Sequence, residues 1–148
     1  MRRVRAVSLG RHALRFLPYE PLLIYIRFDG DLETDEARAL TATIAGELAG
    51  RCGRFVVDAS RLGACGPDSR RELLAQAPDP RARGGQILDF LLVGASLRQK
   101  LLLMQLMSLI GLPPESPGQT LFFDALDDAL LWLCLPPEIL GDPDGAAG

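Results

Sequence analysis

The fold of this chain is decided by the stretch Arg54-Phe-Val-Val-Asp-Ala-Ser-Arg-Leu-Gly-Ala-Cys-Gly-Pro-Asp-Ser-Arg-Arg-Glu-Leu-Leu74. Its apolar run at 55–57 predicts a buried strand that ends at Asp58 and Ser60. A tight polar loop follows, and Pro67 predicts the first position of a helix with Asp68 and Ser69 in its first turn. Open α/β sheets place recognition sites where strand ends face helix starts. This stretch therefore predicts the working surface of the protein.

The composition predicts one globular domain in a reducing compartment. The chain has 148 residues, 48% hydrophobic content and a net charge of −3, which disfavours disorder and general nucleic-acid binding. The three scattered cysteines, Cys52, Cys65 and Cys134, predict ordinary buried thiols. The start of the chain lacks the unbroken apolar run of a signal peptide. We therefore expect a cytoplasmic protein.

Apolar periodicity and turn residues predict alternating strands and helices. The predicted strands are residues 12–17, 22–28, 54–58, 88–93 and 120–123. Thr34, Ser96 and Asp124 are predicted to cap three helices, and a fourth helix starts at Pro67 and is expected to reach about residue 77. The first two strands form a hairpin whose second arm ends at Gly30. Residues 78–85 read as a loop.

This order predicts an α/β fold, with a single-domain mixed and mainly parallel sheet of 4–5 strands and about four helices. The domain is expected to span residues 11–135. Residues 1–10 form an N-terminal extension that could add a short edge strand, and residues 136–148 form a disordered tail.

The helix expected over 97–111 carries more apolar surface than one core requires. Ser96 and Gln99 have the spacing of a capping box at its start. Its apolar side chains cover an arc of roughly 220°, against the ~100° that a single core face needs. We expect this helix to contribute to a protein–protein contact, most simply a homodimer. Full burial within the domain and contact with a bound ligand are also compatible with this pattern. The predicted interface residues are Leu102, Leu103, Leu106, Met107 and Ile110.

No pattern in the sequence predicts a catalytic or metal site. The single histidine, His12, stands at the start of the hairpin, where an exposed polar residue is expected. Neither a metal-ligand cluster nor a phosphate-binding glycine loop is present, so we expect no enzyme activity, no metal and no cofactor.

Asp58 ends a strand, as does the phosphoacceptor of bacterial receiver domains, and Asp29 and Asp31 could imitate their acidic pair. Receiver domains also need a lysine at the end of their last strand. The only lysine here, Lys100, falls within a predicted helix, so the set of receiver residues is incomplete. Asp58 is instead expected to accept hydrogen bonds from the backbone N–H of Ser60 or Arg61.

Residues 22–133 resemble the SpoIIAA-like superfamily, which includes STAS domains, and are most similar to bacterial STAS/SEC14-type proteins. The resemblance rests on three segments: Arg54-Phe-Val-Val-Asp-Ala-Ser-Arg-Leu62, Phe90-Leu-Leu-Val-Gly94 and Leu121-Phe-Phe-Asp-Ala-Leu-Asp-Asp-Ala-Leu130. It implies a regulatory module that binds a protein such as a kinase or an anti-sigma-like factor. Anti-sigma antagonists carry a phosphorylatable serine or threonine at the position of Asp68, and Ser69 lies one residue later. This departure argues against switching by serine phosphorylation.

The sequence therefore favours a non-catalytic interaction module whose protein partner docks on the loop 58–71 and adjacent helices. The predicted partner-binding residues are Asp58, Ser60, Gly66, Pro67, Asp68, Ser69, Arg70, Gly94 and Ser96. We expect the segment 66–69 to be exposed at one end of the sheet, beside the start of the helix that follows Ser96. The alternative is a small carrier of an apolar ligand or lipid, as the SEC14-like relatives imply, and a phosphoacceptor at Asp58 ranks below it. Neither a nucleic-acid partner nor a membrane span is expected.

Overall fold

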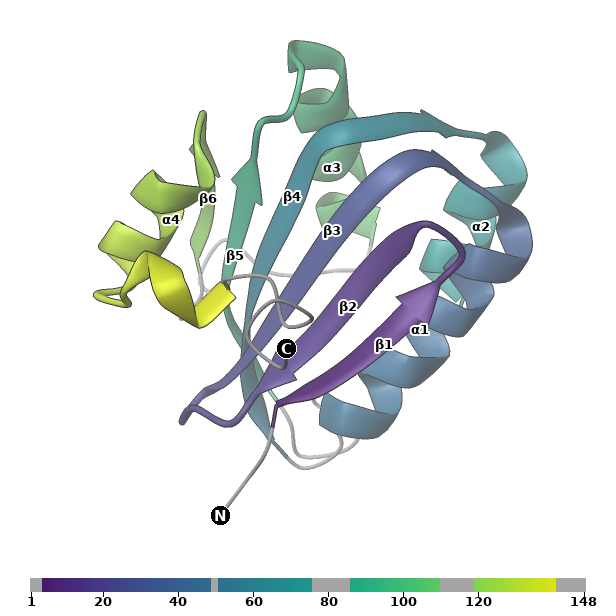
Figure 1. The fold of residues 1–148 in the computed structure, drawn as a ribbon. Coiled ribbons are helices and arrows are strands. Elements are labelled where there is room, and N and C mark those ends of the chain that lie inside the picture. Colours follow the sequence, from purple (N-terminus) through teal and green to yellow (C-terminus); the bar gives the residue numbers. More distant parts are fainter. Residues whose placement is uncertain (1–3, 49–50, 76–85, 110–118, 141–148) are drawn as a thin grey trace.

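A computed structural model describes residues 4–48, 51–75, 86–109 and 119–140, which form a six-stranded sheet flanked by helices (Figure 1). The strands are β1 (Arg5–Leu9), β2 (His12–Leu17), β3 (Leu22–Leu32), β4 (Cys52–Cys65), β5 (Gln86–Val93) and β6 (Gln119–Phe123). The helices are α1 (Thr34–Leu48), α2 (Pro67–Ala75), α3 (Leu97–Leu109), α4 (Leu126–Trp132) and the 3₁₀ helix η1 (Pro137–Leu140).

The strands follow one another across the sheet in chain order. The first three, β1 to β3, pair antiparallel, and β3 to β6 pair parallel. The predicted α/β class and mixed, mainly parallel sheet are confirmed, but the expected 4–5 strands are too few. The additional edge strand is β1, which lies within the segment 1–10 that the sequence assigned to an extension.

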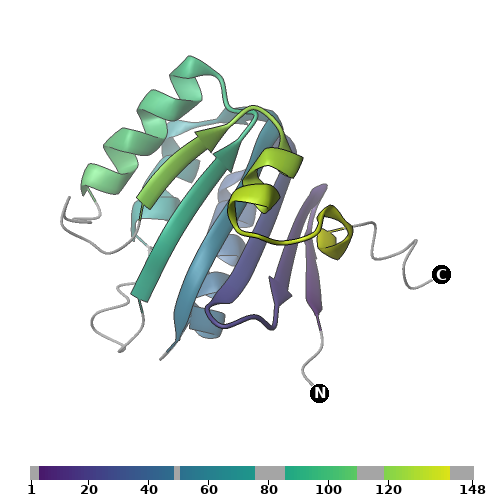
Figure 2. The same cartoon turned by 90° about the vertical axis from the view of Figure 1, so that its left-hand side faces the viewer.

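Helices cover both faces of the sheet (Figures 1 and 2). Helices α1, α2 and α3 lie on one face, and α4 and η1 lie on the other. All three helices of the first group connect parallel strands, so they begin at the same end of the sheet, where β3, β4 and β5 finish. The sheet therefore gathers three strand ends and three helix starts along one edge.

Alternation along the strands divides the core into two layers. On one face, Ile24 and Val57 pack with Ile44 of α1, and on the other, Val56 and Leu91 pack beneath α4. Successive residues of a strand point to opposite faces, so a strand covered on both sides reads as a continuous apolar run. This explains why the run at 55–57 identified the central strand correctly.

Two strands continue further than the sequence predicted. Gly30 does not end β3, and the polar stretch after Asp58 is not a tight loop, because β3 and β4 remain paired as far as Leu32 and Cys65. Gly30 takes a φ of 88°, and the register between the strands shifts on each side of it. Glycine tolerates such a conformation, so the strand passes through an irregularity instead of stopping.

Two predicted helix caps were wrong, and one was right. Helix α1 already includes Thr34, and its first turn is closed by Glu33, whose carbonyl accepts from the Ala37 N–H at 2.9 Å. Helix α4 has Ala125 at its N-cap position without a side-chain cap bond, so Asp124 does not cap it. The capping box of α3 is confirmed (Ser96 N to Gln99 Oε1, 2.9 Å; Gln99 N to Ser96 Oγ, 3.2 Å).

His12 is buried, whereas the sequence predicted an exposed residue. Its Nδ1 accepts a hydrogen bond from the Asp29 N–H at 3.0 Å, and its Nε2 lies 3.0 Å from the carbonyl oxygen of Asp31. An accepting Nδ1 assigns the ring proton to Nε2, which donates to that carbonyl. The ring therefore satisfies backbone groups of the irregular part of β3.

The cysteines are more exposed to solvent than the sequence predicted. Cys52 and Cys134 are exposed and Cys65 is half-buried, so the prediction of buried thiols was wrong for two of the three.

The C-terminal segment contains one further element. Helix η1 lies within the segment 136–148 that was predicted as a disordered tail, and Arg15 Nη1 donates to the Leu140 carbonyl at 3.1 Å. The predicted loop 78–85, the helix ends expected at 77 and 111, and residues 141–148 lie outside the described residues.

Candidate functional site

The end of β4 separates from β5 at Asp58 and continues along β3 alone. The last residue pair between β4 and β5 is Asp58 with Val93. Gly94 then turns away with a φ of 67°, and a Cβ at this position would lie 2.7 Å from the Ser60 Cβ. Only glycine combines this conformation with so close an approach. The segment that leads into α3 is therefore pressed against the extended part of β4.

Asp58 is held by the turn that follows it. Its Oδ1 accepts from the Ser60 backbone N–H at 3.0 Å and from the Ser60 hydroxyl at 2.6 Å, which confirms the structural role predicted for it. The two other aspartates of the supposed receiver set also contact neighbours. Asp31 Oδ1 accepts from the Ala64 N–H at 2.7 Å, and Asp29 lies 3.6 Å from Arg11. These contacts fasten the irregular ends of β3 and β4.

The side chain of Gln99 joins the start of α3 to β4, a contact that was not predicted from the sequence. Gln99 Nε2 donates to the Leu62 carbonyl at 3.4 Å, while Gln99 Oε1 accepts the Ser96 N–H. One amide therefore caps α3 and connects it to the adjacent strand. Only the capping half of this arrangement had a signal in the sequence.

The start of α2 rests on β3 and α1 through Ser69. Ser69 Oγ donates to the Leu32 carbonyl at 2.8 Å and lies 3.5 Å from Thr34 Oγ1. Ser69 is only 4% exposed, so the prediction of an exposed segment 66–69 fails at this residue. Pro67 and Asp68 are exposed, and Asp68 Oδ1 accepts from Arg71 Nη1 at 3.2 Å. Asp68 therefore faces solvent while its neighbour anchors the helix.

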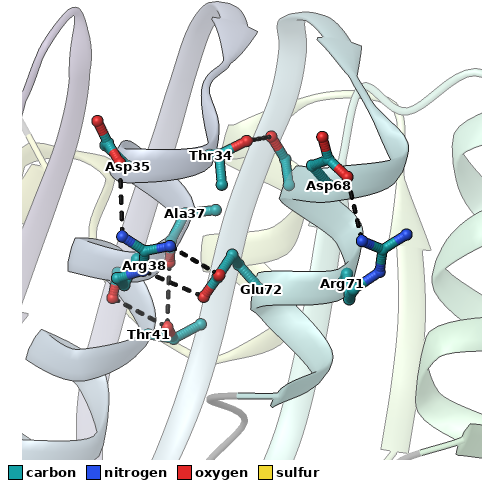
Figure 3. Close-up of polar contacts among 9 residues, drawn as sticks. Thr34, Asp35, Ala37, Arg38, Thr41, Asp68, Arg71 and Glu72 are labelled. Carbon is teal, nitrogen blue, oxygen red and sulfur yellow. Dashed lines mark hydrogen bonds and ion pairs between the residues drawn. The ribbon is translucent and has the colours of Figure 1, made fainter.

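A second contact fixes α2 against α1. Arg38 of α1 binds both carboxylate oxygens of Glu72, at 2.8 and 3.3 Å, and also lies 3.6 Å from Asp35 (Figure 3). The hydrogen bond from Arg38 holds the pKa of Glu72 below its usual range, and the same bond raises the pKa of Arg38. Although exposed, this bidentate pair restricts how α2 sits beside α1.

The structure brings most of the predicted partner-binding residues to one end of the sheet. Asp58 pairs with Val93, Gly94 lies against Ser60, and Gln99 links the Ser96 cap to Leu62, while Gly66 to Arg70 start α2 at the same end. The start of α3 therefore contacts residues 60–62, at the same end of the sheet as 66–69. We call the solvent-exposed part of this end the docking edge, which comprises Ser60, Arg61, Gly63, Ala64, Pro67, Asp68, Ser96 and Arg98.

The apolar residues predicted as an interface on α3 are only partly described. Leu102 is half-buried, whereas the side chains of Leu103, Leu106 and Met107, and all of Ile110, lie outside the described part of the chain. The described apolar residues of α3 that face solvent are Leu97, Leu101 and Met104.

Comparison with known proteins assigns no family to the chain. No protein-family model matches it, and no curated protein matches it. Within the described residues, no helix has the length and apolar character needed to cross a membrane. The same residues contain no group of three or more histidine, cysteine, aspartate or glutamate side chains placed to hold a metal ion.

Proposed function

We propose that this chain is a non-catalytic interaction module of the STAS type, and that a protein partner binds its docking edge. The observation that carries the proposal is the convergence of the β4 extension with the starts of α2 and α3. Three separate segments are held there by a buried hydrogen bond from Ser69 to Leu32 and a half-buried one from Gln99 to Leu62, while their outer side chains stay in solvent. A rigid support beneath exposed side chains lowers the entropic cost of binding a partner.

The side chains of the docking edge suit recognition better than chemistry. The carboxylate of Asp58 is the best candidate for a reactive group in this region, and one of its oxygens already accepts two hydrogen bonds from Ser60. The exposed charges that remain are Arg61 and Arg98 and the pair formed by Asp68 with Arg71. Such charges set the encounter rate and the specificity of a protein contact. Regulation by a serine kinase at Ser69 is no part of the proposal, because Ser69 is buried.

Quantitative affinity capture from the source cells tests the proposal. The chain carrying Arg61→Glu and Asp68→Arg is compared with the wild type, and Arg51→Glu serves as a charge-reversal control at an exposed position directly before β4, at the opposite end of the sheet. We expect a defined protein to be retained by the wild type and the control and lost from the docking-edge variant. Retention by all three would contradict the proposal. Recovery of a lipid in place of a protein would favour the carrier alternative.

A further inference from the structure

The two helices beside the edge strand β6 each expose large apolar side chains. The charged residues around these side chains are basic on α3 and acidic on α4. On α3, Leu97, Leu101 and Met104 are 73%, 53% and 55% exposed, and their spacing places them on one stripe of the helix. On α4, Leu131 and Trp132 are 75% and 44% exposed. Large apolar side chains that face solvent in groups mark surfaces for association.

The charges around these two apolar surfaces are complementary. Arg98 and Lys100 flank the stripe on α3, and no acidic residue occurs in that helix. On α4, Asp127 and Asp128 precede the two apolar residues by four positions, so they share the same exposed face. Neither α4 nor η1 contains a basic residue. In the described part of the chain, neither Asp127 nor Asp128 forms an ion pair.

The two helices lie on opposite faces of the sheet and both border β6 (Figure 2). Lys100 of α3 sits 5.5 Å from the ring centroid of Phe122, and Leu126 of α4 packs with Leu121 and Phe123 on the other side of the strand. Among the described strands, β6 pairs only with β5 and ends the sheet. A two-fold axis that runs along this edge would exchange the two faces of the sheet. It would therefore place α3 of the first copy beside α4 of the second, and α4 of the first copy beside α3 of the second.

We infer that two copies of this chain form a symmetric dimer around β6, in which α3 of each copy packs on α4 of the other. The apolar stripe of α3 meets Leu131 and Trp132, while Arg98 and Lys100 face Asp127 and Asp128. The second copy is the occupant because one chain carries both halves of the complementary pair. An α3–α3 contact would bring basic residues together, and like charges oppose association. This surface overlaps the docking edge only at Arg98, and the dimer does not depend on the proposed partner.

Sedimentation equilibrium of the full chain over a concentration series tests the dimer. One variant reverses the charge of α3 (Arg98→Glu with Lys100→Glu), and another reverses α4 (Asp127→Lys with Asp128→Lys). We expect the wild type to dimerise and each variant alone to dimerise about tenfold or more weakly. An equimolar mixture of the two variants should regain wild-type association, because every α3 then faces an α4 of opposite charge.

Matched controls separate loss of contact from loss of fold. Arg27→Glu reverses a charge on β3 and should leave the association unchanged, and each variant should keep the circular dichroism of the wild type. Leu131→Ser, which alters no charge, should weaken the dimer, whereas Tyr19→Ser, at an exposed hydrophobic position outside this surface, should not. A wild type that stays monomeric up to 100 µM would overturn the inference, as would a mixture that associates no better than its components. An α3-reversed variant that dimerises as well as the wild type would point to a different contact and would also overturn it.

Discussion

Replacing Ser69 by alanine tests whether this residue anchors α2 or belongs to the binding surface. Its hydroxyl donates to the carbonyl of Leu32 at 2.8 Å, and both residues are 4% exposed. Ser69→Ala leaves that buried carbonyl without its donor, which costs about 1–3 kcal/mol in the free energy of unfolding. In a chain of this size, each kcal/mol lowers the melting temperature by about 2–4 °C.

Urea unfolding followed by circular dichroism measures the effect, with Ser60→Ala as the matched control. Ser60 also donates its hydroxyl, but it is exposed, and its backbone N–H still bonds to Asp58 after the change. We expect the control to change the unfolding free energy by about 0.5 kcal/mol or less. Ser69→Asp should destabilise more than Ser69→Ala, because it places a charge at the buried position. Equal, small effects of all three substitutions would refute the anchoring role of Ser69.

Three further predictions concern titration and reactivity. Carbon-detected NMR should find the pKa of Glu72 below the usual carboxyl range, and Arg38→Gln should raise that pKa. Any stabilisation from this exposed pair is present above the ordinary carboxyl pKa, and it is lost as the pH falls through the lowered value. Burial, followed by the nearby charge of Asp58, raises the pKa of Tyr25, so ultraviolet titration should show a high phenol pKa that Asp58→Asn reduces in part. The raised pKa of Tyr25 also links its ionisation to stability. Its contribution to the free energy of unfolding is complete below the phenol pKa of the unfolded chain and is lost as the pH rises through the folded value. Burial raises the pKa of the Cys65 thiol, so at neutral pH this residue should react with a thiol reagent more slowly than the two exposed cysteines.

The layered sheet could be predicted because its signals are local. The apolar runs at 55–57 and 90–93 are characteristic of strands covered on both faces, and the structure has them in β4 and β5, two interior strands of the sheet. Pro67 marked the start of α2, and the Ser96–Gln99 box marked the start of α3. In each case, residues close in sequence determine the feature.

The errors arose where distant residues decide the structure. The extension of β4 beyond Asp58 depends on pairing with β3, on the conformation of Gly30 and on the hydrogen bond that the Ala64 N–H donates to Asp31. The burial of His12 follows from the same irregularity, because the ring bonds to the backbone of β3. The polar composition of residues 58–66 is typical of a loop, and it gives no local indication of a strand that is covered on one side only.

The candidate site was predicted as a region more accurately than as a set of residues. Adjacent parallel strands end at the same edge, so the meeting of Asp58, Gly94 and Ser96 follows from topology. The burial of Ser69 and the role of Gln99 as a link to Leu62 depend on how α1, α2 and α3 pack, for which the sequence has no local pattern.

The central claim is that a protein binds at the docking edge, and site-specific photo-crosslinking in the source cells tests it most directly. A photoreactive amino acid is placed at Arg61, Ala64 or Asp68, and, as controls, at Tyr19 and Arg51, which are also exposed but lie at the opposite end of the sheet. We expect one protein adduct of the same mass at all three docking-edge positions and at neither control. An adduct confined to the controls, or no protein adduct from the docking edge while the controls report efficient labelling, would contradict it.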